Sequence, residues 1–240
     1  MGAATADQSD NSVERLNRFG VRLVIREQIR PVVYLILMSI VAGTWRWWNA
    51  WVCAATLQLV TIAYHLILVR VNPAVLNARG TKNEGTKKPD RCFLGLMVIF
   101  GFGILIVGAL EVGKEGWTAP WWMLVTGVLL IACGMLSVTW AMAVNPHFEV
   151  TIRVQTDRKH QVCTTGPYGY VRHPGYAFGM LAIWAFPMIL GSWWAMVPAA
   201  GLTIATAVRS AFEDRTLQRE LLGYSEYAAT TRYRMIPGLW

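Results

Sequence analysis

The most prominent feature of the chain is a series of long apolar runs separated by short polar segments. The runs are Val32–Thr44, Ala50–Val69, Cys92–Leu110, Trp121–Val144, Tyr176–Leu190 and Trp193–Val208. A helix needs about 20 residues, within a range of about 17–25, to cross the hydrocarbon core of a bilayer. The second, third and fourth runs reach this length, whereas the other three are shorter. The pattern predicts an all-α integral membrane protein with five to six transmembrane helices.

The last two runs predict a helical hairpin whose turn contains Gly191 and Ser192. Helices of that length rise roughly 22–24 Å, which is less than a hydrocarbon core of about 30 Å. We therefore expect either a shallow hairpin or two helices that extend by about a turn into the flanking segments. The first run likewise reaches a spanning length only if its helix begins before Pro31.

Composition and charge support a membrane protein. Apolar residues make up 55% of the chain and charged residues 15%, against about 45–50% and about 25% in soluble domains. The net charge of +8 is unevenly distributed, because nearly all of the 22 lysines and arginines lie in residues 1–30, 70–91, 145–172 and 209–240. These basic segments alternate with loops that hold only Arg46 and Lys114, so the positive-inside rule predicts that both termini are cytoplasmic. The charge points to lipid phosphates as neighbours, and not to nucleic acid.

The four cysteines, Cys53, Cys92, Cys133 and Cys163, are scattered along the chain. They form neither a disulfide framework nor a spacing typical of a zinc site. We therefore expect no metal.

We expect a single domain over residues 1–240, divided into three parts. Arginines recur at helical spacing between Arg15 and Arg30, which predicts an amphipathic cytoplasmic leader over residues 1–30. Residues 32–144 are apolar helices, and residues 145–240 hold the candidate chemistry.

Two polar features lie in this last part. Residues 145–176 contain Gly-Pro and Pro-Gly turns interleaved with tyrosines, a composition that suits either a structural loop or a loop that binds a small polar ligand. Arg209 and Glu213 are four positions apart and so share one face of a helix. They form either an exposed ion pair, worth about 0.3–0.5 kcal/mol, or a pair in which arginine binds a carboxylate or phosphate and glutamate an ammonium group.

The C-terminal part, about residues 145–240, resembles the isoprenylcysteine carboxyl methyltransferase family and its phospholipid N-methyltransferase relatives. The motifs that carry the resemblance are His160-Gln-Val-Cys163, Thr165-Gly-Pro-Tyr168, Arg172-His-Pro-Gly-Tyr176, Arg209-x-x-x-Glu213-Asp214 and Gly223-Tyr-x-x-Tyr227. Further upstream, Asn72-Pro-x-x-Leu76 resembles the bacterial members. The resemblance implies S-adenosyl-L-methionine as methyl donor, a bacterial inner-membrane location and a cytoplasmic active site.

The resemblance also implies roles for individual residues. The cofactor-binding residues would be Gln155, His160, Gln161, Val162, Cys163, Tyr168, His173, Pro174, Gly175, Tyr176 and Glu213. Arg209 would bind the substrate, and Arg209 and Glu213 would be the catalytic residues. We expect an isoprenoid or lipid-like acceptor, with a carboxylate favoured because it is ionised at neutral pH and needs no general base.

Three alternatives stay open. A phospholipid amine could replace the carboxylate, with arginine holding the phosphate and Glu213 or His173 serving as the base. A membrane reductase of the sterol-reductase type shares this C-terminal pattern and takes NADPH. A transport or accessory protein would instead need ionisable residues midway along its spans, where the sequence shows only His65 near a span end.

Overall fold

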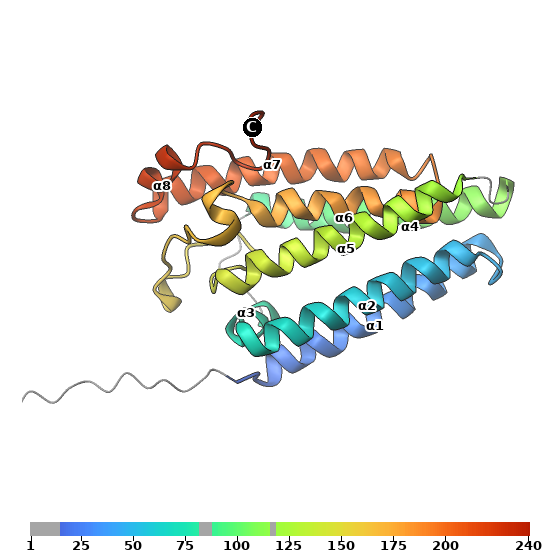
Figure 1. The fold of residues 1–240 in the computed structure, drawn as a ribbon, viewed down its shortest axis with the longest axis horizontal. Helices are drawn as coiled ribbons and strands as arrows, with labels where there is room; N and C mark the ends of the chain where they lie inside the picture. Colours follow the sequence, from blue (N-terminus) through green and yellow to red (C-terminus); the bar gives the residue numbers. More distant parts are fainter. Residues whose placement is uncertain (1–14, 82–87, 116–118) are drawn as a thin grey trace, which may run out of the picture.

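The computed structural model describes residues 15–81, 88–115 and 119–240, and these residues contain helices and loops but no strand. Six helices run roughly side by side along the molecule (Figure 1). They are α1 (Arg18–Ala42), α2 (Trp48–Val71), α4 (Lys88–Glu115), α5 (Trp121–Val144), α6 (Pro174–Leu190) and α7 (Met196–Glu220). The shorter α3 (Pro73–Gly80) and α8 (Tyr224–Thr230) lie at one end of this bundle. The all-α prediction is confirmed.

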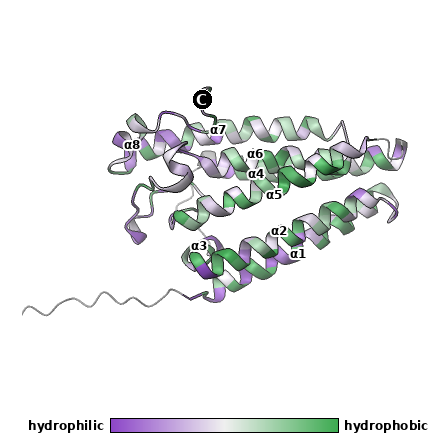
Figure 2. Ribbon diagram, in the orientation of Figure 1, coloured by the Kyte–Doolittle hydropathy of each residue, from purple (hydrophilic) through white to green (hydrophobic). Residues whose placement is uncertain are grey.

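Three helices are long and apolar enough to cross a membrane, within α2, α4 and α5, and α6 is a shorter apolar helix. At most 33% of each spanning window is buried inside the protein, so most of its apolar side chains point outward. Outward-facing apolar side chains along a whole helix are typical of lipid contact. Figure 2 shows hydrophobic residues along the middle of the bundle, with hydrophilic residues concentrated at the end that carries α3 and α8.

Helix α1 is longer than its apolar run. It begins at Arg18, where the side chain of Asn17 accepts hydrogen bonds from the amides of Phe19 and Gly20, and it continues through Pro31 to Ala42. The arginine-rich segment from Arg18 onward and the first apolar run therefore form one helix. Its 25 residues correspond to a length of roughly 37 Å.

The predicted hairpin is present. Gly191 ends α6 in the left-handed region, with φ of 70°, and the next helix begins at Met196. The turn is held by α4, because the carboxylate of Glu111 accepts hydrogen bonds from the Ser192 hydroxyl and from the Trp194 amide, the latter at 3.2 Å. Helix α7 continues to Glu220, far more than the expected single turn past Val208. Arg209, Glu213 and Asp214 of this extension find partners within the protein, which removes the reason for the helix to end at the apolar boundary.

Helix α3 packs closely against the start of α1. The Asn77 side chain accepts a hydrogen bond from the Asn17 amide and donates one to the Arg15 carbonyl. A Cβ atom at Gly80 would lie 2.2 Å from the Phe19 carbonyl oxygen, so only glycine allows this approach. The polar end of the bundle is thus an ordered layer on which the loop between α5 and α6 lies.

Candidate active site

The loop between α5 and α6 has its own internal supports. The buried Gln155 side chain donates a hydrogen bond of 2.7 Å to the His147 carbonyl, and the Asn145 side chain donates one of 3.0 Å to the Tyr168 hydroxyl. Arg153 forms ion pairs with Glu149 and Asp157 at 2.9 and 2.8 Å. The contacts of Gln155, Tyr168 and the buried Glu149 close the loop on itself, so that its 160–164 segment keeps a defined path, whereas the Asp157 pair lies at the surface.

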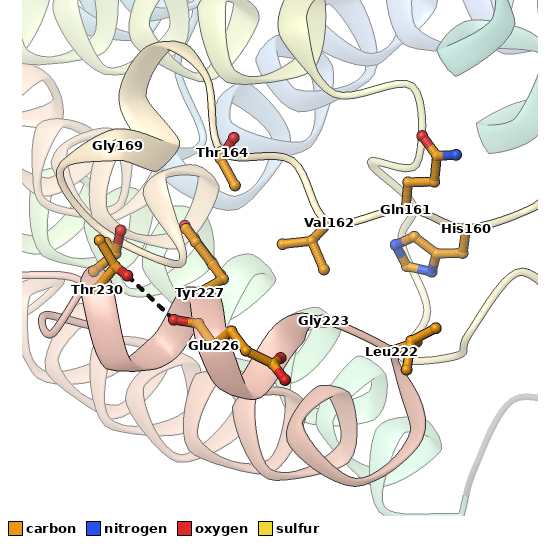
Figure 3. A pocket seen from close by; sticks show the side chains of 11 residues that line it. His160, Gln161, Val162, Thr164, Gly169, Leu222, Gly223, Glu226, Tyr227 and Thr230 are labelled. Carbon is orange, nitrogen blue, oxygen red and sulfur yellow. Dashed lines mark hydrogen bonds between the residues drawn. The ribbon is translucent and has the colours of Figure 1, made fainter.

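A pocket of about 600 Å³ lies between this loop and α8. Figure 3 shows the 160–164 segment on one side of it and α8 on the other, with the Val162 side chain between them and the Gln161 side chain extended away from α8. Its lining residues are His160, Gln161, Val162, Thr164, Gly169, Leu222, Gly223, Glu226, Tyr227, Thr230 and Thr231. Because the pocket contains amide, hydroxyl, imidazole and carboxylate groups beside apolar side chains, it suits a polar small molecule with a flat ring.

His160 is held at the edge of the pocket by a second histidine. Its ring packs on that of His147, with centroids 4.5 Å apart, and its Nδ1 accepts a hydrogen bond from the Gln155 amide at 3.3 Å. Burial, together with the charges of the neighbouring His147, Arg158 and Arg153, lowers the pKa of His160 to about 4. Burial also lowers the pKa of His147. Both rings are therefore neutral at neutral pH, and His160 acts as a hydrogen-bond acceptor inside the loop.

Behind the pocket, Asp214 of α7 is the centre of a buried ionic cluster. Its carboxylate, which is fully buried, accepts two hydrogen bonds from Arg172, at 2.8 and 3.0 Å, and one each from His173 and Arg234. Gln218 and Tyr224 complete its set of partners. This cluster ties the start of α6, the end of α7 and the C-terminal segment together, which places the Arg172-His-Pro motif against α7.

The Tyr224 contact also connects this cluster to the pocket. Tyr224 and the pocket residue Tyr227 are neighbours on α8, with ring centroids 5.5 Å apart. The Tyr227 hydroxyl donates a hydrogen bond of 2.7 Å to the Tyr168 carbonyl, which holds α8 against the loop.

Arg209 and Glu213 are not paired with each other by a salt bridge in the part of the chain that the structure describes. The Tyr176 hydroxyl donates a hydrogen bond of 2.5 Å to Glu213, whereas Arg209 binds Asp90 at the start of α4. The guanidinium of Arg209 also lies over the rings of Phe93 and Tyr176, at 4.6 and 5.4 Å from their centroids. The arginine is thus fixed between two aromatic rings at the point where α7 leaves its apolar run.

Apart from Pro174 and Gly175, the candidate residues fall into three groups. Only His160, Gln161 and Val162 line the pocket. Gln155, Cys163 and Tyr168 lie in or beside the loop core, where Cys163 contacts the Val144 carbonyl. His173, Tyr176, Arg209 and Glu213 form a polar layer between α6 and α7, in which His173 and Arg209 are buried and Tyr176 and Glu213 are half-buried.

Pro174 and Gly175 open helix α6. Proline occupies the first turn, where a missing amide costs no intrahelical bond. A Cβ atom on Gly175 would lie 2.5 Å from the Phe148 ring, so glycine lets the loop pack against the helix. In the described structure both residues pack in the protein, and their contact with a cofactor stays a prediction.

Asp90, Asp214 and helix α8 complete the site, and none of them was among the predicted site residues. Asp214 belongs to a quoted motif, and α8 contains the quoted Gly223-Tyr-x-x-Tyr227 motif, so those two signals were present in the sequence. Asp90 had no such signal, because its partner lies 119 positions away.

Comparison with known proteins agrees with the motifs. Residues 122–222 match the family model described as phospholipid methyltransferase, and the resemblance drawn from the sequence is confirmed. The matched segment extends from α5 through the loop to the end of α7 and includes Arg209, Glu213 and Asp214. A search of curated proteins finds no match to the chain. The family match supports a membrane methyltransferase, and methyltransferases of this family generally use S-adenosylmethionine.

Proposed function

We propose that this protein transfers a methyl group from S-adenosylmethionine to an isoprenoid or lipid-like acceptor at the cytoplasmic face of the membrane, with a carboxylate as the methylated group. The observation that carries the proposal is the fixed position of Arg209. This buried cation lies where an apolar helix meets a polar pocket layer, so that a lipid-like tail can remain in the bilayer while its anionic head reaches the guanidinium.

The pocket between the loop and α8 fits the methyl donor in size and chemistry. Its volume of about 600 Å³ lies within the range of about 300–1,000 Å³ typical of small-molecule sites. Gln161, Tyr227 and Glu226 offer an amide, an aromatic ring and a carboxylate for the ribose and the adenine of the donor. Val162 offers an apolar contact for the base.

When bound, S-adenosylmethionine supplies a methyl group that its sulfonium already activates, so the protein needs chiefly to hold three atoms in line. Glu213 would lie near the cationic end of the donor, held in place by its hydrogen bond from Tyr176. The proposed contacts of Gln155, Cys163, Tyr168, His173, Pro174 and Gly175 would support the loop and helix start around it.

A carboxylate acceptor suits this arrangement because it needs no proton removal. Arg209 would orient the carboxylate by donating to one oxygen, and the other oxygen would form a bond to the methyl carbon as the bond from that carbon to sulfur breaks, leaving S-adenosylhomocysteine. The arginine shares its charge with Asp90, so it would orient the acceptor without fully neutralising the attacking oxygen.

The test is to incubate membranes containing the protein with radiolabelled S-adenosylmethionine and N-acetyl-S-farnesylcysteine, a prenylated thiol acid. We expect label in the lipid extract that alkali releases as volatile methanol, because a methyl ester is base-labile. Membranes without the protein are the control. Alkali-stable label that migrates with phospholipid would contradict the carboxylate assignment.

The second candidate is N-methylation of a phospholipid amine, which is favoured by the description of the matched family as phospholipid methyltransferase. In that case Arg209 would hold the phosphate diester and Glu213 would accept the ammonium proton. The same experiment separates the two, since N-methyl groups survive mild alkali.

A further inference from the structure

The carboxylate of Asp90 connects the start of α4 to the proposed acceptor site. Asp90 is only 2% exposed and lies in the first turn of α4, outside the matched family segment. Its Oδ1 accepts a hydrogen bond from Nε of Arg209 at 2.9 Å and forms an ion pair with Nη2 of the same guanidinium at 2.8 Å. Its Oδ2 accepts one from the amide of Ile152 at 2.9 Å. One side chain thus joins α4, α7 and the loop that follows α5.

The chemistry of these contacts requires an ionised carboxylate. All three partners are N–H donors, so the residue must offer only acceptors, and an amide side chain would direct its own N–H group at one of them. A buried carboxylate and a buried guanidinium also each need an opposite charge nearby. Asp90 meets both requirements for Arg209.

The remaining contacts of Arg209 restrict the orientation of its guanidinium. Nη2 also donates to the Val150 carbonyl, and the rings of Phe93 and Tyr176 confine the guanidinium. Among the contacts of the described residues, Nη1 is the one nitrogen of this guanidinium without a hydrogen-bond partner. The guanidinium therefore has a fixed plane, and its Nη1 edge is left with donors to offer to a ligand.

We propose that Asp90 is a positioning residue for the methyl acceptor: it fixes the plane of Arg209 and offsets its charge, so that the Nη1 edge alone meets the anionic head of the acceptor. The inference rests on the proposed function, because it assigns Asp90 a role in the acceptor half of that site. The donor pocket is lined by residues 160–164, Gly169 and the α8 region, which Asp90 does not contact. Changes at Asp90 should therefore affect the acceptor and spare the donor.

The experiment compares Asp90→Asn and Asp90→Glu with the wild-type protein, all as full chains in detergent micelles. The steady-state KM and kcat are measured with N-acetyl-S-farnesylcysteine and, separately, with phosphatidylethanolamine in mixed micelles. The dissociation constant for S-adenosylhomocysteine is measured by calorimetry. The matched control is Asp157→Asn, which removes the same carboxylate from an exposed ion pair with Arg153 in the same loop region.

For Asp90→Asn we expect the KM for the acceptor to rise about tenfold or more, since a charge-assisted contact is lost. The affinity for S-adenosylhomocysteine should stay within about twofold of the wild-type value. Asp90→Glu, which keeps the charge, should restore part of the acceptor KM, and the control should match the wild type. Should Asp90→Asn fail to fold, Asp90→Glu still tests the inference, because a raised acceptor KM with unchanged donor affinity is expected there too.

Two results would overturn the inference. One is a folded Asp90 variant with wild-type acceptor kinetics, and the other is an equal loss of acceptor and donor affinity, which a purely structural role would produce. Absence of methyl transfer by the wild-type protein to either acceptor would instead overturn the proposed function, and this is established before any variant is compared.

Discussion

At the residue scale, the side chain of the site with the most hydrogen bonds among the described residues is the carboxylate of Asp214, which does not line the donor pocket. Asp214 is fully buried and accepts hydrogen bonds from Arg172, His173, Arg234, Gln218 and Tyr224. Burying a charge is costly unless it is paired and hydrogen-bonded, and this cluster satisfies both conditions. Asp214 is therefore placed to stabilise the fold around the site.

Replacing Asp214 by asparagine should strongly destabilise the protein. The amide keeps the shape of the side chain, but it leaves Arg172 buried without its opposite charge, a loss of about 3–5 kcal/mol in comparable cases. Thermal unfolding in detergent micelles measures the effect as a drop in midpoint temperature. Asp157→Asn is the control and should change the midpoint little, because its ion pair with Arg153 is exposed. Equal shifts for the two variants would contradict the role given to Asp214.

A second prediction at this scale concerns the pH dependence of the loop. The pKa of His160 in the folded protein is about 4, below the ordinary value of about 6.5. The ordered loop is therefore favoured above that ordinary value and loses stability as the pH falls toward the folded-state pKa. Protonation would turn Nδ1 into a donor facing the Gln155 amide, which is itself a donor. We expect the affinity for S-adenosylhomocysteine to fall several-fold between about pH 7 and about pH 5.

The control for this prediction is His160→Asn, whose side-chain oxygen can accept the same hydrogen bond but does not titrate. Its affinity should depend less steeply on pH than that of the wild type, with His147 supplying the remaining slope because its pKa is also lowered. Identical pH profiles for the two proteins would mean that His160 does not govern the loop.

At the scale of elements, the polar end of the bundle depends on one close helix contact. Gly80 of α3 lies so near the backbone of Phe19 in α1 that a methyl group has no space. The Asn77 side chain then bonds the backbone at Asn17 and Arg15. This contact holds α3 beneath the loop, where Arg79 lies over the ring of Phe148 at 5.7 Å.

Gly80→Ala should separate the two helices and destabilise the protein by about 1–3 kcal/mol, the usual cost of overpacking. The matched control is Gly101→Ala in α4, where a Cβ atom meets nothing within 4 Å. That substitution should be neutral or stabilise the helix by up to about 1 kcal/mol, since alanine restricts the unfolded chain more than glycine does. Both values come from unfolding in micelles. A Gly80→Ala protein as stable as the Gly101→Ala protein would show that α3 is free to move.

At the scale of the whole molecule, the six long helices alternate in direction along the bundle. As a consequence, the start of α1, helix α3, the loop after α5 and the end of α7 gather at one end (Figure 1). These are the basic segments of the sequence, as far as the described residues include them. The opposite end carries the hairpin turn at Gly191 and the tryptophans beside it. The fold therefore has the charge asymmetry that the positive-inside rule associates with a cytoplasmic face.

Cysteine labelling tests this orientation. In a background with all four native cysteines replaced, single cysteines are introduced at Tyr170 and Trp194, which are 72% and 64% exposed at opposite ends. A membrane-impermeant maleimide added to intact cells should label Trp194→Cys, and it should label Tyr170→Cys only after the cells are opened. Labelling of both sites from outside would contradict the cytoplasmic placement of the site, and labelling of neither in intact cells would contradict a spanning hairpin.

The sequence by itself determined the class of the fold, the positions of the apolar helices and the resemblance to phospholipid methyltransferases that the family model matches over residues 122–222. Apolar runs of spanning length specify helices because a bilayer leaves backbone polar groups no partner outside the segment. The turn at Gly191 was equally readable, since its left-handed conformation favours glycine. The motifs of the C-terminal part identified the loop and the α7 face, because their residue types and spacing are local properties of the chain.

Only the tertiary structure determined where the residues of those motifs lie relative to one another. It separated the predicted cofactor residues into pocket lining, loop core and polar layer, and it brought α8 to the pocket. It also joined Arg209 to Asp90 across 119 positions, although helical spacing had suggested Glu213 as the neighbour. The physical reason is that periodicity reports which side chains share a face of one helix, whereas burial of a charge is satisfied by whichever opposite charge the packing of other helices brings within reach.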